Sequence, residues 1–333
     1  MSSKYFLVRS PFRVSLFGGG TDYPEYYSNH KGAVIGFSIN KYIYLGGLLT
    51  NDYVDYKYKL SYSKLEMTEN IKNIMHPSVR EGMKYMKFKS PIDLSFQADL
   101  PASSGLGSSS SFSSGFLKLL AEIQGKKFSK DELSRKAINL DRNILKEDVG
   151  VQDHLHSTYG GINKFSFYKD KITRRSIRMT NKSLNLLESS MMLVHTGKKR
   201  QASSIAVEQI KKTKNNQIDS NLEEMFTMVN QAENILVDLN KNNLKELGSL
   251  LNSSWEIKKT LTTKISSREL DKIYKRGMKL GAYGGKLCGA GGGGFFLFLL
   301  PSHRKNSFRK YFGQKNCIDF RIDFSGLQSI FKG

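Results

Sequence analysis

The feature that most constrains the fold is a serine- and glycine-rich segment at residues 101–116, PASSGLGSSSSFSSGF, which runs directly into the apolar segment LKLLAEI. Apolar residues recur there at helical spacing: Phe112, Phe116, Leu119, Leu120 and Ile123. This spacing predicts a helix that begins in the serine run and continues to about Gly125. The most flexible and most hydroxylated part of the chain therefore stands at the start of a helix.

A helix start of this composition has the chemistry of an anion site. The first turn of a helix has unpaired backbone N–H groups and the positive end of the helix dipole. Gly105 and Gly107 allow the backbone to turn tightly and approach a ligand. The serine hydroxyls add donors, or an oxygen ligand for Mg²⁺. An ordinary serine-rich loop has the same composition, and the lysine of a GxxxxGK[ST] phosphate loop is absent.

The rest of the chain predicts a mixture of strands and helices. Strands are expected from β-branched and aromatic runs at residues 4–10, 32–39, 41–49, 54–63, 92–100, 160–168 and 191–197. A short helix is expected within residues 66–86, with Ile71, Ile74 and Met75 on one face. A second helix follows Ser129, which forms a capping box with Glu132. Mostly helical residues 202–281 precede a glycine-dense segment, 281–294.

Length and charge narrow the class of protein. With 333 residues the chain is expected to form two domains, divided at residues 1–185 and 186–333. The chain has 52 Lys and Arg against 30 Asp and Glu, a net charge of +22. Such an excess attracts anions: nucleic acid, lipid headgroups or phosphorylated metabolites. No arginine-rich tail, zinc finger or RNP-like motif is present, so we expect no nucleic-acid partner.

Membrane insertion and disulfide bonding are not expected. The longest apolar run, FFLFLL at residues 295–300, is far shorter than the ~20 residues that a membrane span needs. The first residues, MSSKYFLVRSPF, contain no apolar signal region, so a cytoplasmic location is expected. The two cysteines, Cys288 and Cys317, lie in no zinc-binding spacing and are expected to be buried thiols.

Two more segments, taken with the serine-rich one, carry a family resemblance. SPFRVSLFGGGTDYPEYY near the N-terminus and GGKLCGAGGGGFF near the C-terminus stand in order and spacing with PASSGLGSSSS. Together they resemble the GHMP small-molecule kinases over residues 9–300. The resemblance implies an α+β fold of two domains, one like ribosomal protein S5 domain 2 and one ferredoxin-like with extra helices. ATP and the acceptor are then expected in the groove between the domains.

Four further stretches resemble one group in that family, the sugar-1-kinases for D-glycero-D-manno-heptose 7-phosphate. They are FGGGTDYPEYY, VGVQDH, TYGGIN and HTGKKRQAS. The resemblance implies transfer of phosphate from ATP to the anomeric hydroxyl, giving the 1,7-bisphosphate used for nucleotide-activated heptose. Another sugar-1-kinase, such as an L-fucokinase, and a sugar-sensing regulator without catalysis stay as alternatives. Oligomeric state is not predicted.

The resemblance also implies roles for single residues on the nucleotide side. It assigns the ATP phosphates to one run: Ser104, Gly105, Leu106, Gly107, Ser108, Ser109 and Ser110. Within that run Ser109 is expected to bind Mg²⁺, with Ser108 or Ser110 as alternatives. Asp141, where relatives carry Glu, is expected to be the second metal ligand, with Glu147 as the alternative.

On the acceptor side, the resemblance assigns catalysis to Asp153 and Arg13. Asp153 is expected to deprotonate the attacking hydroxyl, and Arg13 to keep that carboxylate ionised. A further set is expected to contact the substrate: Gly19, Gly20, Thr21, Asp22, Gly291 and Gly292. Lys198 and Arg200, beside Lys199, are expected to bind the 7-phosphate, although a solvated basic cluster is the alternative.

Overall fold

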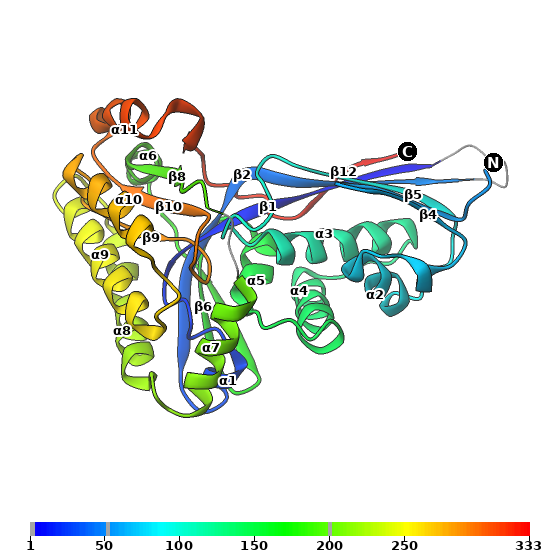
Figure 1. The fold of residues 1–333 in the computed structure, drawn as a ribbon, viewed down its shortest axis with the longest axis horizontal. Helices are drawn as coiled ribbons and strands as arrows, with labels where there is room; N and C mark the ends of the chain where they lie inside the picture. The colour runs from blue at the N-terminus through cyan, green and yellow to red at the C-terminus, as the bar shows by residue number, and fades with distance from the viewer. Residues whose placement is uncertain (1–3, 51–53, 199–201) are drawn as a thin grey trace.

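The computed structural model describes residues 4–50, 54–198 and 202–333, and its strands form two sheets (Figure 1). The first sheet has eight strands: β12-β1-β2-β5-β3-β4 in order, with β6 on β2 and β7 on β6. Their bounds are β1 (Tyr5–Phe17), β2 (Gly32–Leu49), β3 (Tyr58–Ser61), β4 (Leu65–Thr68), β5 (Ile92–Ala98), β6 (Ile162–Tyr168), β7 (Lys171–Ser176) and β12 (Gln328–Lys332). Strands and helices together confirm the predicted α+β class.

The long strand β2 joins two parts of this sheet. Its first residues pair with β6, from Gly32 to Phe37, and its later residues pair with β5, from Ile43 to Leu49. The sequence predicts two strands here, at 32–39 and 41–49, whereas the structure has one strand of 18 residues. The pairing with β1 continues across this point with a register shift, since Pro11 pairs with Tyr42 and Arg13 with Ser38, which leaves the extra residues on β2.

Helices cover one face of the first sheet (Figure 1). They are α2 (Pro77–Tyr85), α3 (Ser108–Ile123), α4 (Lys130–Asn139) and α5 (Gln152–Tyr159), with a π-helical turn at Leu140–Ile144. A short helix, α1 (Pro24–Tyr27), follows β1. The predicted helix α3 is confirmed, and so is the capping box of Ser129 and Glu132 that begins α4. No local pattern predicts α5, because its eight residues have no long apolar repeat.

A short helix does lie within residues 66–86, but the predicted face of Ile71, Ile74 and Met75 is wrong. Ile71 lies in a 3₁₀ turn at Ile71–Asn73, Ile74 and Met75 follow that turn, and the helix begins only at Pro77. Proline favours the first helical position because it lacks an N–H group and its φ is fixed at a helical value. It also holds the preceding residue, His76, in an extended conformation that ends the earlier segment.

The second sheet has four strands in the order β11-β8-β10-β9. These are β8 (Met191–His195), β9 (Gly284–Leu287), β10 (Phe295–Leu299) and β11 (Cys317–Ile318). Its helices are α6 (Asn181–Ser190), α7 (Ala202–Lys214), α8 (Asp219–Val237), α9 (Leu244–Leu261), α10 (Arg268–Lys279) and α11 (Lys305–Phe312). Trp255 of α9 packs edge-on against Phe296 of β10, at 5.7 Å between ring centroids. The glycine-rich segment 288–294 is the turn between β9 and β10.

The chain crosses between the two parts of the molecule more than once. The predicted division at residues 185 and 186 falls inside α6, and β12 returns to pair with β1 in the first sheet. We propose, from this pairing, that the second domain ends before β12. Both cysteines are buried and free. Among the described residues, no helix has the length and apolar character needed to cross a membrane.

Candidate active site

A cavity of about 720 Å³ opens where the three glycine-rich segments meet. Its wall includes Arg13, Gly19, Asp22, Gly107, Glu147 and Asp153. Gly107 has φ +77°, and a Cβ built on it would stand 3.0 Å from Cγ of Arg13. Gly105 has φ +78°, and its Cβ would stand 2.5 Å from the carbonyl oxygen of Cys288. Glycine is therefore required at both positions by conformation and by space.

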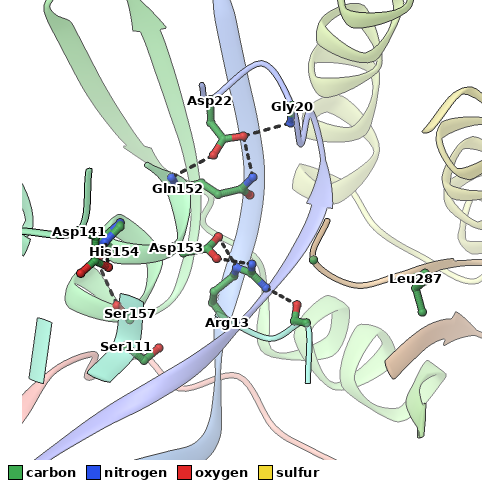
Figure 2. Close-up of polar contacts among 12 residues, drawn as sticks. Arg13, Gly20, Asp22, Ser111, Asp141, Gln152, Asp153, His154, Ser157 and Leu287 are labelled. Atoms are coloured by element: carbon green, nitrogen blue, oxygen red, sulfur yellow. Dashed lines mark hydrogen bonds and ion pairs between the residues drawn. The ribbon is translucent and has the colours of Figure 1, made fainter. Parts of the chain in front are cut away.

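Arg13 and Asp153 form a two-pronged ion pair on the cavity wall (Figure 2). Nε of Arg13 donates to Oδ1 of Asp153 at 2.6 Å, and Nη2 donates to Oδ2 at 2.5 Å. Nη1 donates to the carbonyl oxygen of Gly105 at 2.7 Å, which ties the pair to the serine-rich loop. Burial alone lowers the pKa of Arg13, but the charge and hydrogen bonds of Asp153 outweigh it and raise the pKa. The guanidinium is thus permanently charged beside the carboxylate.

Asp22 is held by three donors from two segments (Figure 2). Its Oδ1 accepts from the backbone N–H of Gly20 at 3.0 Å and from Nε2 of Gln152 at 2.9 Å. Its Oδ2 accepts from the backbone N–H of Gln152 at 3.2 Å. Burial, followed by the charge of Asp153, raises the pKa of Asp22. The first glycine-rich segment is therefore bonded to the residue that immediately precedes Asp153.

The start of α3 faces the same cavity. Gly107 is the N-cap residue in a left-handed conformation and supplies no side-chain cap, while Ser108, Ser109 and Ser110 line the wall. The N–H groups of this first turn have no partner inside the helix. Ser109 Oγ donates to Oε2 of Glu147 at a long 3.4 Å. Burial, then the charge of Asp141, raises the pKa of Glu147.

Asp141 departs from its expected place. It is fully buried and is not part of the cavity wall. Its Oδ1 accepts from Oγ of Ser113 at 2.6 Å, and its Oδ2 lies 2.8 Å from Nε2 of His154. Both oxygens are thus engaged inside the protein, one of them by His154 of α5, the helix that also carries Asp153 (Figure 2). Glu147, the alternative ligand, lies on the wall.

Several other expected site residues lie outside the wall. Thr21 is buried and donates to the carbonyl oxygens of Gly18 and Ala33, so it fixes the turn before Asp22. Gly291 and Gly292 face Ile265 and Ile205, while Gly289 and Ala290 line the cavity. Ser104, Gly105 and Leu106 are buried within the serine-rich loop and do not line the cavity. Lys198 is exposed and off the wall, and Lys199 and Arg200 lie outside the described residues.

The structure adds polar wall residues that sequence reasoning missed: Ser15, Gln152, Lys258 and Lys286. Lys286 Nζ donates to the carbonyl oxygen of Leu16 at 2.7 Å and so links β9 to β1. Burial lowers the pKa of Lys286 to about 8. A lysine between glycines in GGKLCG was a visible signal for Lys286. For Lys258, on the amphipathic helix α9, no local signal exists.

Comparison with known proteins identifies the family. The model for the N-terminal domain of GHMP kinases matches residues 61–161, and the model for their C-terminal domain matches residues 235–318. The chain is 30% identical to D-glycero-alpha-D-manno-heptose 7-phosphate kinase from Campylobacter jejuni, over 98% of this chain and 99% of that protein. The chain belongs to the GHMP kinases, and it is a phosphotransferase that acts on an alcohol group.

Solved structures show the same two-domain fold. One described as a D-glycero-D-manno-heptose 1-phosphate kinase from Bacteriodes thetaiotaomicron has a TM-score of 0.75 at 21% identity, with 99% of each chain covered. Galactokinase from Lactococcus lactis, complexed with galactose, has a TM-score of 0.74 at 19% identity, covering 99% of this chain and 95% of that one. At these identities the likeness establishes the fold alone.

Proposed function

We propose that this protein is an ATP-dependent sugar kinase that phosphorylates the anomeric hydroxyl of D-glycero-D-manno-heptose 7-phosphate. The product would be the 1,7-bisphosphate, which suits cytoplasmic synthesis of nucleotide-activated heptose for surface polysaccharide. The observation that carries the proposal is the Arg13–Asp153 ion pair, which lies on the wall of the same cavity as the open start of α3. Similarity along the full length of the Campylobacter jejuni heptose 7-phosphate kinase supports the choice of sugar.

In this proposal the two sides of the cavity have different roles: one binds ATP, and the other binds the sugar and activates its hydroxyl. The N–H groups at the start of α3 bind the triphosphate of ATP. Asp153 accepts the proton of the anomeric hydroxyl, whose oxygen then bonds to the γ-phosphorus. The bond from that phosphorus to the β–γ bridging oxygen breaks, and ADP leaves with the electron pair. Arg13 offsets the charge that develops on the transferring group.

A magnesium ion fits the residues on the nucleotide side. Mg²⁺ in kinases is bound by one or two protein oxygens together with substrate phosphates. Ser109 and Glu147 supply two such oxygens on the wall, already 3.4 Å apart. The described residues contain no cluster of three or more His, Cys, Asp or Glu that would hold a metal without the nucleotide. When bound, the ion would neutralise charge on the phosphate oxygens.

The proposal is tested by an acceptor screen. ADP release would be measured with heptose 7-phosphate, heptose 1-phosphate, free heptose, L-fucose and galactose at equal ATP. The two heptose phosphates are both needed because the relatives carry names with phosphate at different positions. Preference for the 7-phosphate is expected. Turnover of L-fucose or galactose alone would replace the proposed substrate, and no turnover of any sugar would remove the proposal.

Binding of the 7-phosphate by Arg200 and Lys198 stays a prediction. Lys198 is exposed and Arg200 lies outside the described residues. We expect Arg200→Ala to raise KM for heptose 7-phosphate by about ten- to a hundredfold, because a charge-assisted contact is worth about 1.5–3 kcal/mol. KM for unphosphorylated heptose should be unchanged. An equal KM for the phosphorylated sugar in both proteins would contradict this role.

A further inference from the structure

Two buried polar atoms on the cavity wall have no hydrogen-bond partner among the described residues. They are Oγ of Ser15 and Oε1 of Gln152, in residues that are only 6% and 7% exposed. A buried polar atom without a partner costs about 1–3 kcal/mol. Other buried atoms of the described residues also lack a partner, but only Ser15 Oγ and Gln152 Oε1 belong to residues of the cavity wall. Because both residues line the same cavity, a ligand bound there can supply the missing hydrogen bonds.

The orientation of Gln152 is fixed by Asp22. Its Nε2 donates to Oδ1 of Asp22 at 2.9 Å, and the reversed amide would place two acceptor oxygens together. Oε1 is therefore the atom that is left for a ligand, and it can only accept a hydrogen bond. The partner that it needs is a donor, such as a hydroxyl group.

The side chain of Ser15 lies on the same face of β1 as that of Arg13. Arg13 and Ser15 lie two residues apart on β1, with no register shift between them, so their side chains share one face of the strand. A serine hydroxyl donates and accepts. Oγ of Ser15 thus complements the acceptor of Gln152, and a sugar hydroxyl, which also donates and accepts, matches both.

Gly19 leaves room for such a group between the two side chains. A Cβ built on Gly19 would stand 3.5 Å from Oγ of Ser15 and 3.6 Å from Nε2 of Gln152. Gly19 itself lines the cavity. Its φ lies outside the left-handed region, so the backbone does not require glycine there. The missing side chain opens space beside Ser15 and Gln152.

We propose that Ser15 and Gln152, with Gly19 between them, form a subsite that binds a ring hydroxyl of the acceptor sugar next to Asp22. This inference rests on the proposed sugar-kinase function and adds specificity-determining residues to it. Hydrogen bonds to Asp22 fix the backbone and the side chain of Gln152. Gln152 in turn immediately precedes Asp153 in the chain. Recognition of the sugar is thereby coupled to the position of the proposed base.

The first test compares Ser15→Ala with Ser10→Ala. Ser10 lies on the same strand, and its Oγ is also buried without a partner among the described residues, but it is not on the cavity wall. Ser15→Ala should raise KM for heptose 7-phosphate about five- to tenfold and leave KM for ATP unchanged. Its Tm without sugar should hold or rise, because an unpaired buried hydroxyl is removed. Ser10→Ala should change neither KM.

The second test pairs variants with 2-, 3- and 4-deoxy analogues of heptose 7-phosphate. If Ser15 binds one hydroxyl, the penalty of Ser15→Ala disappears for the analogue that lacks this group and persists for the other two. Gly19→Ala should fold with unchanged Tm and weaken binding of every analogue by occupying the subsite. An equal penalty of Ser15→Ala for all three analogues would overturn the inference, as would a lower Tm with both KM values raised.

The two proposals fail in different ways. If no sugar in the acceptor screen is phosphorylated, the proposed function fails, and this subsite falls with it. If a sugar is phosphorylated but Ser15→Ala and Gly19→Ala leave its KM unchanged, the function stands and the subsite is refuted. When the screen selects another sugar, the same comparison is made with the monodeoxy analogues of that sugar.

Discussion

The two sides of the cavity are built differently. On the acceptor side, Arg13, Asp22, Gln152 and Asp153 are joined to one another or to backbone by hydrogen bonds of 3.2 Å or less. On the nucleotide side, the first turn of α3 has no side-chain cap, and Ser109 and Glu147 share one long contact of 3.4 Å. The charged groups of the acceptor side are hydrogen-bonded before any ligand arrives, and only Ser15 Oγ and Gln152 Oε1 there lack a partner among the described residues. On the nucleotide side, the phosphate- and metal-binding groups themselves are still to be satisfied.

This difference follows from what each side has to do. An attacking hydroxyl must be placed within a fraction of an ångström and correctly aligned, so a rigid arrangement favours the reaction. Phosphates and Mg²⁺ bring strong charges of their own and complete their site as they bind. Variants on the two sides should therefore fail in different ways, with loss of turnover on one side and loss of metal and nucleotide affinity on the other.

The largest effect is expected from Asp153→Asn on the acceptor side. The side chain keeps its shape but no longer accepts the proton, and general-base catalysis is worth about 10²–10⁴-fold in rate. We expect kcat to fall by that factor, with KM for ATP changed less than threefold. Steady-state ADP release measures both constants, and circular dichroism controls for folding. An unchanged kcat would remove Asp153 as the base.

A second, smaller effect should separate Glu147 from Asp141. Glu147→Gln should weaken Mg²⁺-dependent binding of ADP about tenfold, measured by isothermal titration with and without the ion, because a ligand charge is lost. Asp141→Asn should leave this affinity within twofold and lower Tm, because it breaks a buried network with Ser113 and His154. The opposite assignment of the two effects would restore Asp141 as the metal ligand.

A third effect, on stability rather than on turnover or affinity, concerns the helix that supports the acceptor side. His156 of α5 is fully buried, and burial, then the charge of Arg13, lowers its pKa from 6.5 to about 3. Between pH 6.5 and 3 the unfolded chain therefore binds a proton that the folded chain does not, so stability falls as the pH falls through this window. The full loss is at most about 5 kcal/mol near pH 3.

His156→Leu removes this titration and tests the sign. Urea unfolding at pH 7, 5 and 4 should show a flatter decline of the free energy of unfolding in the variant than in the parent. Because both ring nitrogens lack a partner among the described residues, the variant should lose little stability at pH 7. A decline with pH as steep as that of the parent protein would show that other groups dominate acid unfolding.

Local sequence patterns predict the starts of α3 and α4 correctly. The start of α3 follows from an apolar repeat behind a serine run, and the start of α4 follows from Ser129 and Glu132. The family resemblance added Arg13, Asp22 and Asp153, which the structure brings to one cavity. Their roles in the reaction stay predictions.

Other features depend on contacts that no local pattern carries. The engagement of Asp141 by His154 and Ser113 requires α3, α5 and the π-helical turn to be packed together. Lys286 lies beside β1 only because its amine reaches the carbonyl oxygen of Leu16, 270 positions earlier in the chain. The 18-residue strand β2 reads as two strands locally, and pairing with β1 along its length makes it one.

The pairing of β12 with β1 also bears on the order in which the molecule forms during translation. Residues 5–17 emerge early, yet their partner on one side, residues 328–332, is synthesised last among the described strands. Until then one edge of β1 exposes unpaired N–H and C=O groups, the kind of edge that joins nascent chains into aggregates. Protection of this edge by a chaperone, or slow completion of the sheet after release from the ribosome, would govern the yield of native protein.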